Sequence, residues 1–282
     1  MALLSVEEVA VRFGGVMALE DVEIDADLGH VTGLIGPNGA GKTTCFNVIT
    51  GLQEPTRGRI RIDGKDVTRA RAHRRARLGV GRTFQRLEVF GSLTARENVL
   101  VAAEIKRRWS RDKSSPREIT EQVIDRVGIR DFAEERCDSL PTGRARLVEL
   151  ARTLATRPRL LLLDEPGSGL DTTETESFGD LLVALATDGL AILRVEHDVE
   201  LVMRVCQRIH VLDFGRVIAQ GTPDEVRSDP RVQAAYLGED AEGAPDEREA
   251  LEGAAYLGED AGGAPDERQA VEGVLADEGA RG

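Results

Sequence analysis

The segment GPNGAGKTT, residues 36–44, constrains this chain more than any other part of its sequence. It fits the pattern G-x-x-x-x-G-K-[ST] and lies between Val31–Ile35, which predicts a strand, and Lys42–Thr50, which predicts a helix. Glycines let the backbone wrap a phosphate group, and the helix start adds its positive dipole end. A tight strand-to-helix turn alone would explain the glycines but not the Lys-Thr pair. The predicted phosphate-binding residues are Gly36, Pro37, Asn38, Gly39, Ala40, Gly41, Lys42, Thr43 and Thr44.

Two side chains of this loop, and two carboxylates further along, have predicted chemical roles. Lys42 is expected to reach the β- and γ-phosphates of ATP, and Thr43 to offer its hydroxyl to Mg²⁺. The leucines 160–163 predict a buried strand that ends in Asp164 and Glu165. Strand ends of a parallel sheet are where α/β proteins place ligand chemistry. We therefore expect Asp164 to hold Mg²⁺ through its water shell and Glu165 to orient and deprotonate an attacking water.

Composition and charge restrict the kinds of partner. The longest central aliphatic run is Leu160–Leu163, far short of the ~20 residues that a membrane span requires. Glu7 and Glu8 interrupt the stretch where a signal peptide needs an apolar core, so the chain is expected to stay in the cytoplasm. From Tyr236 onward there are 14 acidic and 3 basic residues, against 36 acidic and 34 basic before it. This nearly neutral body gives no electrostatic argument for binding nucleic acid.

Alternating apolar and helical patterns over the first 235 residues predict an α/β fold. Leu4–Phe13 and Val22–Asp27 predict an antiparallel β region. Residues from about 86 to 139 predict a helical insert, with a helix start at Ser115-Pro116. The expected architecture is a P-loop NTPase core with a parallel sheet, an antiparallel β subdomain and a helical subdomain insert. Further predicted elements are helices near 143–156 and 173–187, the strand 190–195, and a short helix that starts with a capping box at Thr222.

The end of the chain contains a tandem repeat. Residues 234–253 and 254–273 match at all but three of their 20 positions. Two copies with few large apolar residues cannot stack into a core, so a solenoid is not predicted. We expect one nucleotide-binding domain over residues 1–237 and an acidic, disordered tail over residues 238–282.

With these motifs in order, residues 1–237 resemble the nucleotide-binding subunits of ABC transporters. The resemblance implies further site residues. Phe13 looks like the aromatic residue that stacks on adenine, and Gln85, in GRTFQ, resembles the Q-loop glutamine that touches Mg²⁺ and the γ-phosphate region. Residues 168–171 resemble the D-loop, and His197, in VEHD, resembles the switch histidine that senses the γ-phosphate.

The signature segment departs from the family pattern. The family usually reads L-S-G-G-Q before a helix, whereas this chain reads LPTGR at residues 140–144. The resemblance implies a head-to-tail dimer in which each ATP lies between the loop 36–44 of one subunit and Thr142, Gly143 and Arg144 of the other. Thr142 is expected to replace the serine hydroxyl in part, and Arg144 to add a phosphate or ribose contact. In the alternative interpretation, Pro141 marks an impaired site.

Several segments resemble the branched-chain amino-acid uptake subfamily, namely RFGGVMALEDV, CFNVITGL, GVGRTFQRLEVFGSLTARENVLVA and GTPDEVRSDPRVQAAYLG. This resemblance implies an ATP-hydrolysing subunit at the cytoplasmic face of the plasma membrane. The implied partners are integral membrane permease subunits, a second ABC ATPase subunit or a second copy of this chain, and indirectly an extracytoplasmic substrate-binding protein.

Other interpretations stay open at this stage. Urea or amide uptake and lipopolysaccharide export use similar ATPases, and a soluble ABC ATPase or a non-hydrolysing regulatory subunit is a further class. The arginine-rich run 69–77 has no interleaved aromatic residue. We therefore interpret it as a solvated or membrane-side surface and expect no nucleic-acid partner.

Overall fold

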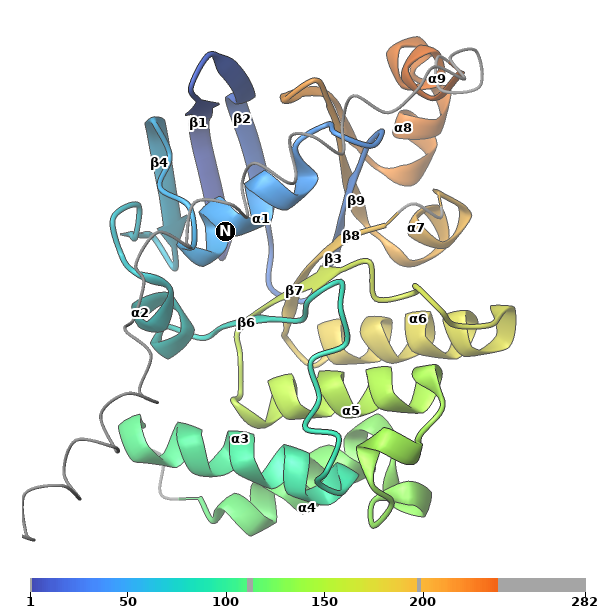
Figure 1. Cartoon of the computed structure of the whole chain (residues 1–282). Helices are drawn as coiled ribbons and strands as arrows, with labels where there is room; N and C mark the ends of the chain where they lie inside the picture. Colours follow the sequence, from blue (N-terminus) through green and yellow to red (C-terminus); the bar gives the residue numbers. More distant parts are fainter. Residues whose placement is uncertain (1, 111–113, 197–198, 238–282) are drawn as a thin grey trace, which may run out of the picture. The chain divides into compact units, whose positions relative to one another are not determined.

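The computed structural model describes residues 2–110, 114–196 and 199–237, which belong to one compact unit (Figure 1). The predicted tail 238–282, with the second repeat copy, and His197 lie outside the described residues. The strands are β1 (Leu4–Phe13), β2 (Val16–Ala26), β3 (Val31–Ile35), β4 (Arg57–Ile62), β5 (Lys65–Asp66), β6 (Val80–Arg82), β7 (Leu160–Asp164), β8 (Ala191–Val195), β9 (Arg208–Asp213) and β10 (Arg216–Gly221). The α-helices are α1 (Lys42–Thr50), α2 (Ala72–Arg77), α3 (Ala95–Trp109), α4 (Pro116–Val127), α5 (Thr142–Ala155), α6 (Thr172–Thr187), α7 (Val199–Val205), α8 (Pro223–Ser228) and α9 (Pro230–Leu237).

A six-stranded, mainly parallel sheet forms the centre of the fold. Its strand order is β10-β9-β3-β8-β7-β6, and all neighbouring pairs are parallel except β9 with β10. Because β3 and β7 run in the same direction, their carboxyl ends lie at one edge of the sheet. The glycine-rich loop follows β3 and the acidic pair ends β7, so the topology brings both predicted motifs to this edge.

A second, antiparallel sheet has the order β2-β1-β4-β5. β1 agrees with the predicted strand, but β2 begins at Val16 rather than at Val22 because a two-residue turn pairs Phe13 directly with Val16. Gly14 in this turn has φ +54, a left-handed conformation that glycine adopts without a steric penalty. Together, the parallel sheet, the antiparallel sheet and the helices confirm the predicted α/β fold class.

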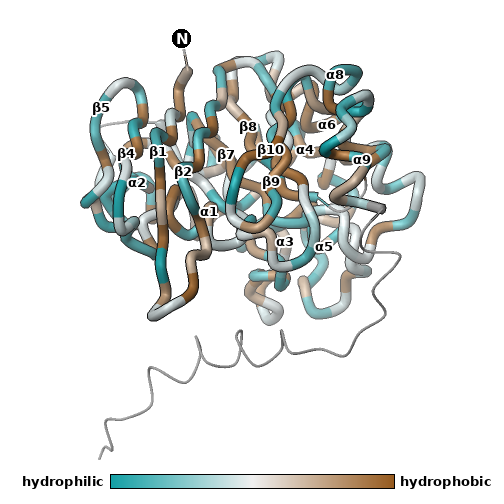
Figure 2. Tube along the Cα trace, turned by 90° about the horizontal axis from the view of Figure 1, so that it is seen from above, coloured by the Kyte–Doolittle hydropathy of each residue, from teal (hydrophilic) through white to brown (hydrophobic). Residues whose placement is uncertain are grey.

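The six-stranded sheet is covered on both faces. In β7, Leu160 and Leu162 pack toward β1, β2 and α1, whereas Leu161 and Leu163 pack toward α5, α6 and α7. This alternation follows from the two-residue period of a strand, and a strand that is apolar at every position requires cover on both sides. Figure 2 shows the resulting contrast between the brown central strands and the mostly teal helix α2.

Helices α3, α4 and α5 surround a separate hydrophobic cluster that includes Val99, Ile124 and Phe132. α4 begins at Pro116, as the sequence predicted, with proline in the first turn. Leu147 of α5 packs against both this cluster and the cluster beneath the parallel sheet. α5 therefore connects the helical region to the sheet that presents the predicted motifs (Figure 1).

His210 is a buried titratable group between the two sheets. Its side chain is fully buried on β9, and neither ring nitrogen has a hydrogen-bond partner within the described part of the chain. Nε2 lies 3.8 Å from the Asp25 carboxylate of β2. Burial lowers the pKa of His210 to about 4, with Asp25 acting against this shift and Arg208 adding to it. The imidazole is therefore neutral in the folded protein at neutral pH.

This burial predicts a pH-dependent loss of stability. The unfolded chain takes up a proton on this histidine near pH 6.5, whereas the folded chain does so only near pH 4. The free energy of unfolding should therefore fall by about 2 kcal/mol between pH 8 and pH 5 on account of this residue. Urea titrations at several pH values should show a smaller dependence in His210→Gln than in the wild type. His73→Gln, at an exposed histidine of α2, is the control; equal pH dependence in all three proteins would contradict the assignment.

Candidate nucleotide site

The loop after β3 has a backbone that only glycine can follow at two positions. Gly36 has φ +153, and a Cβ there would overlap the carbonyl oxygen of Leu212 at the end of β9. Gly41 has φ +104, and a Cβ there would lie 2.8 Å from the carbonyl oxygen of Ala18. The loop is thus pressed between β9 and β2, and these contacts fix its curvature.

Lys42 lies inside this loop. Its Nζ donates hydrogen bonds to the carbonyl oxygens of Gly36 (2.6 Å) and Pro37 (2.8 Å), and the residue is 7% exposed. The first turn of α1 contains no acidic side chain and has no side-chain cap, so its N–H groups and the positive end of its dipole face the loop. Thr43, the second residue of α1, is exposed. This combination of donors fits the phosphate groups of a nucleotide.

The two carboxylates at the end of β7 have different surroundings. Asp164 is 5% exposed and accepts a hydrogen bond from Arg82 at 2.8 Å. Glu165 is partly exposed, has φ +46, and accepts a hydrogen bond from Nε2 of Gln85 at 3.0 Å. The structure therefore joins two predicted residues, Gln85 and Glu165, that are 80 positions apart in the sequence. The left-handed backbone of Glu165 is unusual for a residue with a side chain and marks local strain.

A hydroxyl and a carboxylate are suitable contacts for Mg²⁺, which commonly binds one or two carboxylates together with phosphate oxygens of the substrate. Thr43 and Asp164 provide these groups. Within the described ranges, no cluster of three or more His, Cys, Asp or Glu side chains could hold a metal ion by itself. The hydroxyl of Thr43 and the carboxylate of Asp164 thus fit a Mg²⁺ ion that is also bound by phosphate oxygens.

Sequence reasoning missed the basic residue that contacts Asp164. Arg82 ends β6 and also donates a hydrogen bond to the side chain of Asn47 on α1 at 2.7 Å. Its guanidinium lies over the ring of Phe84 at 4.9 Å, immediately before Gln85. A charged residue that closes an otherwise apolar strand was the available signal, but the pattern does not indicate its partner.

A second missed pair joins α5 to the segment around Gln85. Arg146 donates to the carbonyl oxygens of Phe84 (3.0 Å) and Gln85 (2.6 Å), and to Glu149 at 3.1 Å. Glu149 in turn accepts from the backbone N–H of Glu88 at 3.2 Å. Burial raises the pKa of Glu149, against the effect of these bonds. The helix that begins with the predicted signature residues is therefore bonded to the backbone of the Q-loop.

The signature residues lie at the amino end of α5, where Pro141 is the N-cap. Thr142 is exposed and is close to Gly169 of the predicted D-loop, because a Cβ on that glycine would lie 3.0 Å from the threonine methyl group. The guanidinium of Arg144 lies over the ring of Phe132 at 5.0 Å and 3.8 Å from Glu135. The side chain of Arg144 therefore contacts Phe132 and Glu135 of the segment that precedes α5.

The structure also places a carboxylate beside the signature glycine. A Cβ on Gly143 would overlap the carboxylate of Glu174. Glu174 belongs to the capping box of α6, in which Asp171 accepts from the N–H of Glu174 at 2.8 Å and donates its own N–H to the glutamate at 3.1 Å. The amino end of α5 therefore has an acidic neighbour on α6, although its own first turn contains no acidic residue.

Two other predicted residues, Phe13 and His197, make none of the contacts described above within the described part of the chain. Phe13 ends β1 and is 49% exposed, in the hairpin whose second strand contacts Gly41. His197 lies outside the described residues. Just before it, Glu196 is buried, pairs with the fully buried Arg194 at 2.7 Å and accepts from the N–H of Gly167 at 3.0 Å. The end of β8 is thus bonded to the turn that follows Glu165.

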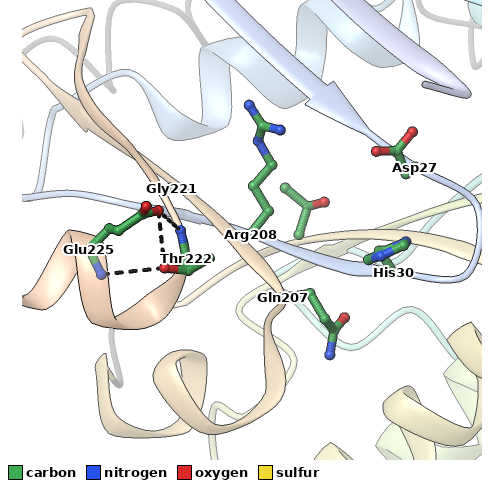
Figure 3. Close-up of a pocket in the computed structure, with 8 residues that line it drawn as sticks. Asp27, His30, Gln207, Arg208, Gly221, Thr222 and Glu225 are labelled. Carbon is green, nitrogen blue, oxygen red and sulfur yellow. Dashed lines mark hydrogen bonds between the residues drawn. The ribbon is translucent and has the colours of Figure 1, made fainter. Parts of the chain in front are cut away.

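A cavity lies at the opposite edge of the sheet (Figure 3). It has a volume of about 370 Å³ and is near the amino ends of β3 and β9. Figure 3 shows Arg208 and His30 on different sides of this space. The predicted nucleotide site follows the carboxyl ends of the strands instead, so the cavity and the predicted site are separate. Its lining residues are Asp27, His30, Thr32, Gln207, Arg208, Gly221, Thr222 and Glu225.

The glycine loop, the lysine inside it and the acidic strand end define a P-loop nucleotide-binding protein. A family model described as ABC transporter matches residues 19–168, and one described as Branched-chain amino acid ATP-binding cassette transporter matches residues 216–242. The chain belongs to the ABC transporter family. None of the helices in the described parts of the chain is long and apolar enough to cross a membrane.

Individual relatives agree with this assignment. The chain is 38% identical to the high-affinity branched-chain amino acid transport ATP-binding protein BraF of Pseudomonas aeruginosa, over 84% of this chain and 98% of that protein. It is 34% identical to the lipopolysaccharide export system ATP-binding protein LptB of Escherichia coli, over 85% of this chain and 99% of that protein. The ADP conformation of MJ1267, an ATP-binding cassette of an ABC transporter, superposes with a TM-score of 0.76 at 29% identity, covering 84% of this chain and 99% of MJ1267.

The bonds between α5 and the Q-loop predict a large effect of one substitution. Arg146→Leu leaves Glu149 as a buried carboxylate without its cationic partner and releases two backbone carbonyls. The free energy of unfolding should fall by about 3 kcal/mol, measured by urea denaturation. The amide of Glu88 should also exchange its hydrogen faster. Arg152→Leu, at a partly exposed position of the same helix, should cost about 1 kcal/mol or less, and equal losses would show that the buried network is not the cause.

Proposed function

We propose that this chain is the ATP-binding and ATP-hydrolysing subunit of a transporter that imports a solute, with branched-chain amino acids as the first candidates. The arrangement of Lys42, Asp164, Glu165 and Gln85 at one edge of the parallel sheet supports this function most directly. Family membership supports the class of protein, and the match of residues 216–242 to the branched-chain amino acid model supports the subfamily.

In this proposal the loop 36–44 surrounds the phosphates of ATP. Its backbone N–H groups and Lys42 contact the β- and γ-phosphates, and Phe13 stacks on the adenine ring. When bound, Mg²⁺ would neutralise part of the phosphate charge, with Thr43, Asp164 and Gln85 as its contacts. The hydrogen bond between Gln85 and Glu165 supports this assignment because it holds the two side chains at one site.

Hydrolysis would then depend on Glu165. A water positioned by this carboxylate attacks the γ-phosphorus, while the bond to the oxygen that bridges the β- and γ-phosphates breaks. The proton of the water passes to Glu165, and the products are ADP and phosphate. Because Glu165 is partly exposed, a water molecule can reach its carboxylate. His197 is proposed to contact the γ-phosphate.

A second ATPase subunit would complete each site, with Thr142, Gly143 and Arg144 facing the nucleotide of the partner. Pro141 has no N–H to donate, and Glu174 places a negative charge beside Gly143. Both features weaken the attraction of this segment for a phosphate. They favour a different ABC ATPase over a second copy of this chain as the partner, because a homodimer would contain this segment at both sites.

The direction of transport and the membrane partners rest on the relatives. BraF is named for high-affinity transport of branched-chain amino acids, and LptB for export of lipopolysaccharide. The additional match of residues 216–242 to a branched-chain amino acid transporter model favours the first candidate. The proposed partners are integral membrane permease subunits and, indirectly, an extracytoplasmic substrate-binding protein. The chain would lie at the cytoplasmic face of the plasma membrane, and export of a lipid by a related system is the second candidate.

The general-base role predicts the behaviour of Glu165→Gln. The variant should still bind ATP, because the amide keeps the shape of the side chain, but turnover should fall on the order of 100-fold or more. ATP should also stabilise a dimer of this variant with its partner subunit, measured by size-exclusion chromatography with light scattering. Glu176→Gln, at an exposed ion pair on α6, is the control. Turnover close to that of the wild type would exclude Glu165 as the base.

The transport role predicts stable association with membrane proteins. A tagged chain expressed in its own host should co-purify with integral membrane subunits after detergent extraction, identified by mass spectrometry. In proteoliposomes of that complex, a binding protein loaded with leucine should stimulate ATP hydrolysis above the level given by the empty binding protein. Co-purification with lipid-exporting subunits would favour the second candidate, and an active complex without membrane subunits would contradict transport.

A further inference from the structure

Arg82 occupies a buried position between three parts of the nucleotide site. Its side chain is 8% exposed, and that of Asp164 is 7% exposed. One terminal nitrogen of the guanidinium donates to Oδ2 of Asp164 at 2.8 Å, and the other donates to Oδ1 of Asn47 at 2.7 Å. Asn47 belongs to α1, which begins with Lys42 of the loop. A single planar group therefore connects the end of β7 to the helix that follows the phosphate-binding loop.

The same guanidinium lies over two aromatic rings. Its central carbon is 5.7 Å from the ring centre of Phe46 on α1 and 4.9 Å from that of Phe84. Phe84 directly precedes Gln85, whose side chain bonds to Glu165. Stacking on aromatic faces and forked hydrogen bonding are properties of arginine that lysine does not reproduce. Arg82 therefore contacts both Phe84, which directly precedes Gln85 of the predicted Q-loop, and the carboxylate of Asp164, which is the predicted Mg²⁺ contact.

Physical chemistry requires a partner for a carboxylate in this position. A buried carboxylate is costly unless it is paired and hydrogen-bonded. Among the described residues, Arg82 is the one hydrogen-bond donor to the Asp164 carboxylate. The bond engages Oδ2, and the second oxygen, Oδ1, keeps its acceptor capacity.

We propose that Arg82 is a positioning residue of the nucleotide site, which orients the Asp164 carboxylate for Mg²⁺ and fixes Phe84 so that Gln85 meets Glu165. The inference rests on the proposed function, because it concerns the same site. It differs from a merely structural ion pair between β6 and β7. A structural role would change stability alone, whereas positioning changes the part of nucleotide affinity that depends on Mg²⁺.

The test measures the affinity for a fluorescent ATP analogue in Mg²⁺ and in EDTA. In Arg82→Gln the affinity in EDTA should stay within about twofold of the wild type, since the loop and Lys42 are intact. The gain in affinity on adding Mg²⁺ should fall by about tenfold or more, as for loss of a group that orients a metal ligand. Arg159→Gln, which removes an arginine from the exposed pair with Asp63, is the charge control and should behave as the wild type.

Two further variants keep the test decisive if Arg82→Gln does not fold, which thermal unfolding would show. Arg82→Lys keeps the charge but replaces the planar, forked guanidinium with a single ammonium nitrogen, so it should lose part of the Mg²⁺-dependent gain. Asn47→Ala removes one arm of the same connection without a change of charge and should lose less.

A double-mutant comparison tests whether Arg82 acts through Asp164. In an Asp164→Asn background, adding Arg82→Gln should change the Mg²⁺-dependent gain by less than about twofold, since the shared pathway is already removed. Additive losses, or an unchanged gain in Arg82→Gln and Arg82→Lys, would overturn the inference. If the wild type does not bind the analogue at all, the proposed function fails instead, so the two failures are distinguishable.

Discussion

The close approach of β9 and β2 to the glycine loop is the constraint on which the rest of the site depends. The loop passes so near the Leu212 carbonyl and the Ala18 carbonyl that a side chain fits neither at Gly36 nor at Gly41. The N–H of Gly215, in the turn between β9 and β10, also donates to the carbonyl of Ala40 at 3.0 Å. The shape of the loop is therefore set by tertiary contacts from both sheets, and not by its own sequence alone. A fixed loop has less conformational entropy to lose when a phosphate binds.

Buried arginines connect the elements around this loop. Arg75 donates to the carbonyls at the end of α1, Arg82 joins β6 to β7 and α1, Arg146 joins α5 to the Q-loop, and Arg194 joins β8 to Glu196. Buried ion pairs add little net stability compared with apolar side chains of similar size, because desolvation offsets their attraction. Their effect here is geometric: Arg75, Arg82 and Arg146 each have partners on two or more segments and hold those segments at defined distances. The ends of β6 and β7 are positioned in this way.

Features that depend on neighbouring residues were predictable from the sequence, whereas contacts between residues far apart in the chain were not. The loop 36–44 and the strand that ends in Asp164 were predictable because their signals are contiguous and depend on local backbone chemistry. The pairing of Arg82 with Asp164 spans 82 positions, and no local pattern indicates it. The same limit applies to β2, whose early start at Val16 depends on pairing with β1, and to Arg144, whose contact with Phe132 becomes visible only when α5 is packed. The role of each predicted site residue remains a prediction that the variants can test.

The two helix N-termini that the proposed mechanism uses are chemically unequal. The first turn of α1 follows Gly41, begins with Lys42 and contains no acidic residue, which favours an anion at this end of the helix. The first turn of α5 follows a proline and adjoins the Glu174 carboxylate. This carboxylate already interacts with the positive end of the α5 dipole, where a phosphate would otherwise be attracted. Glu174 is not a stray charge, because the capping box of α6 requires it. The Glu174 carboxylate therefore stabilises α6 and at the same time weakens the attraction of the amino end of α5 for a phosphate. A nucleotide held by this chain would gain most from a partner whose own signature helix has no such competitor.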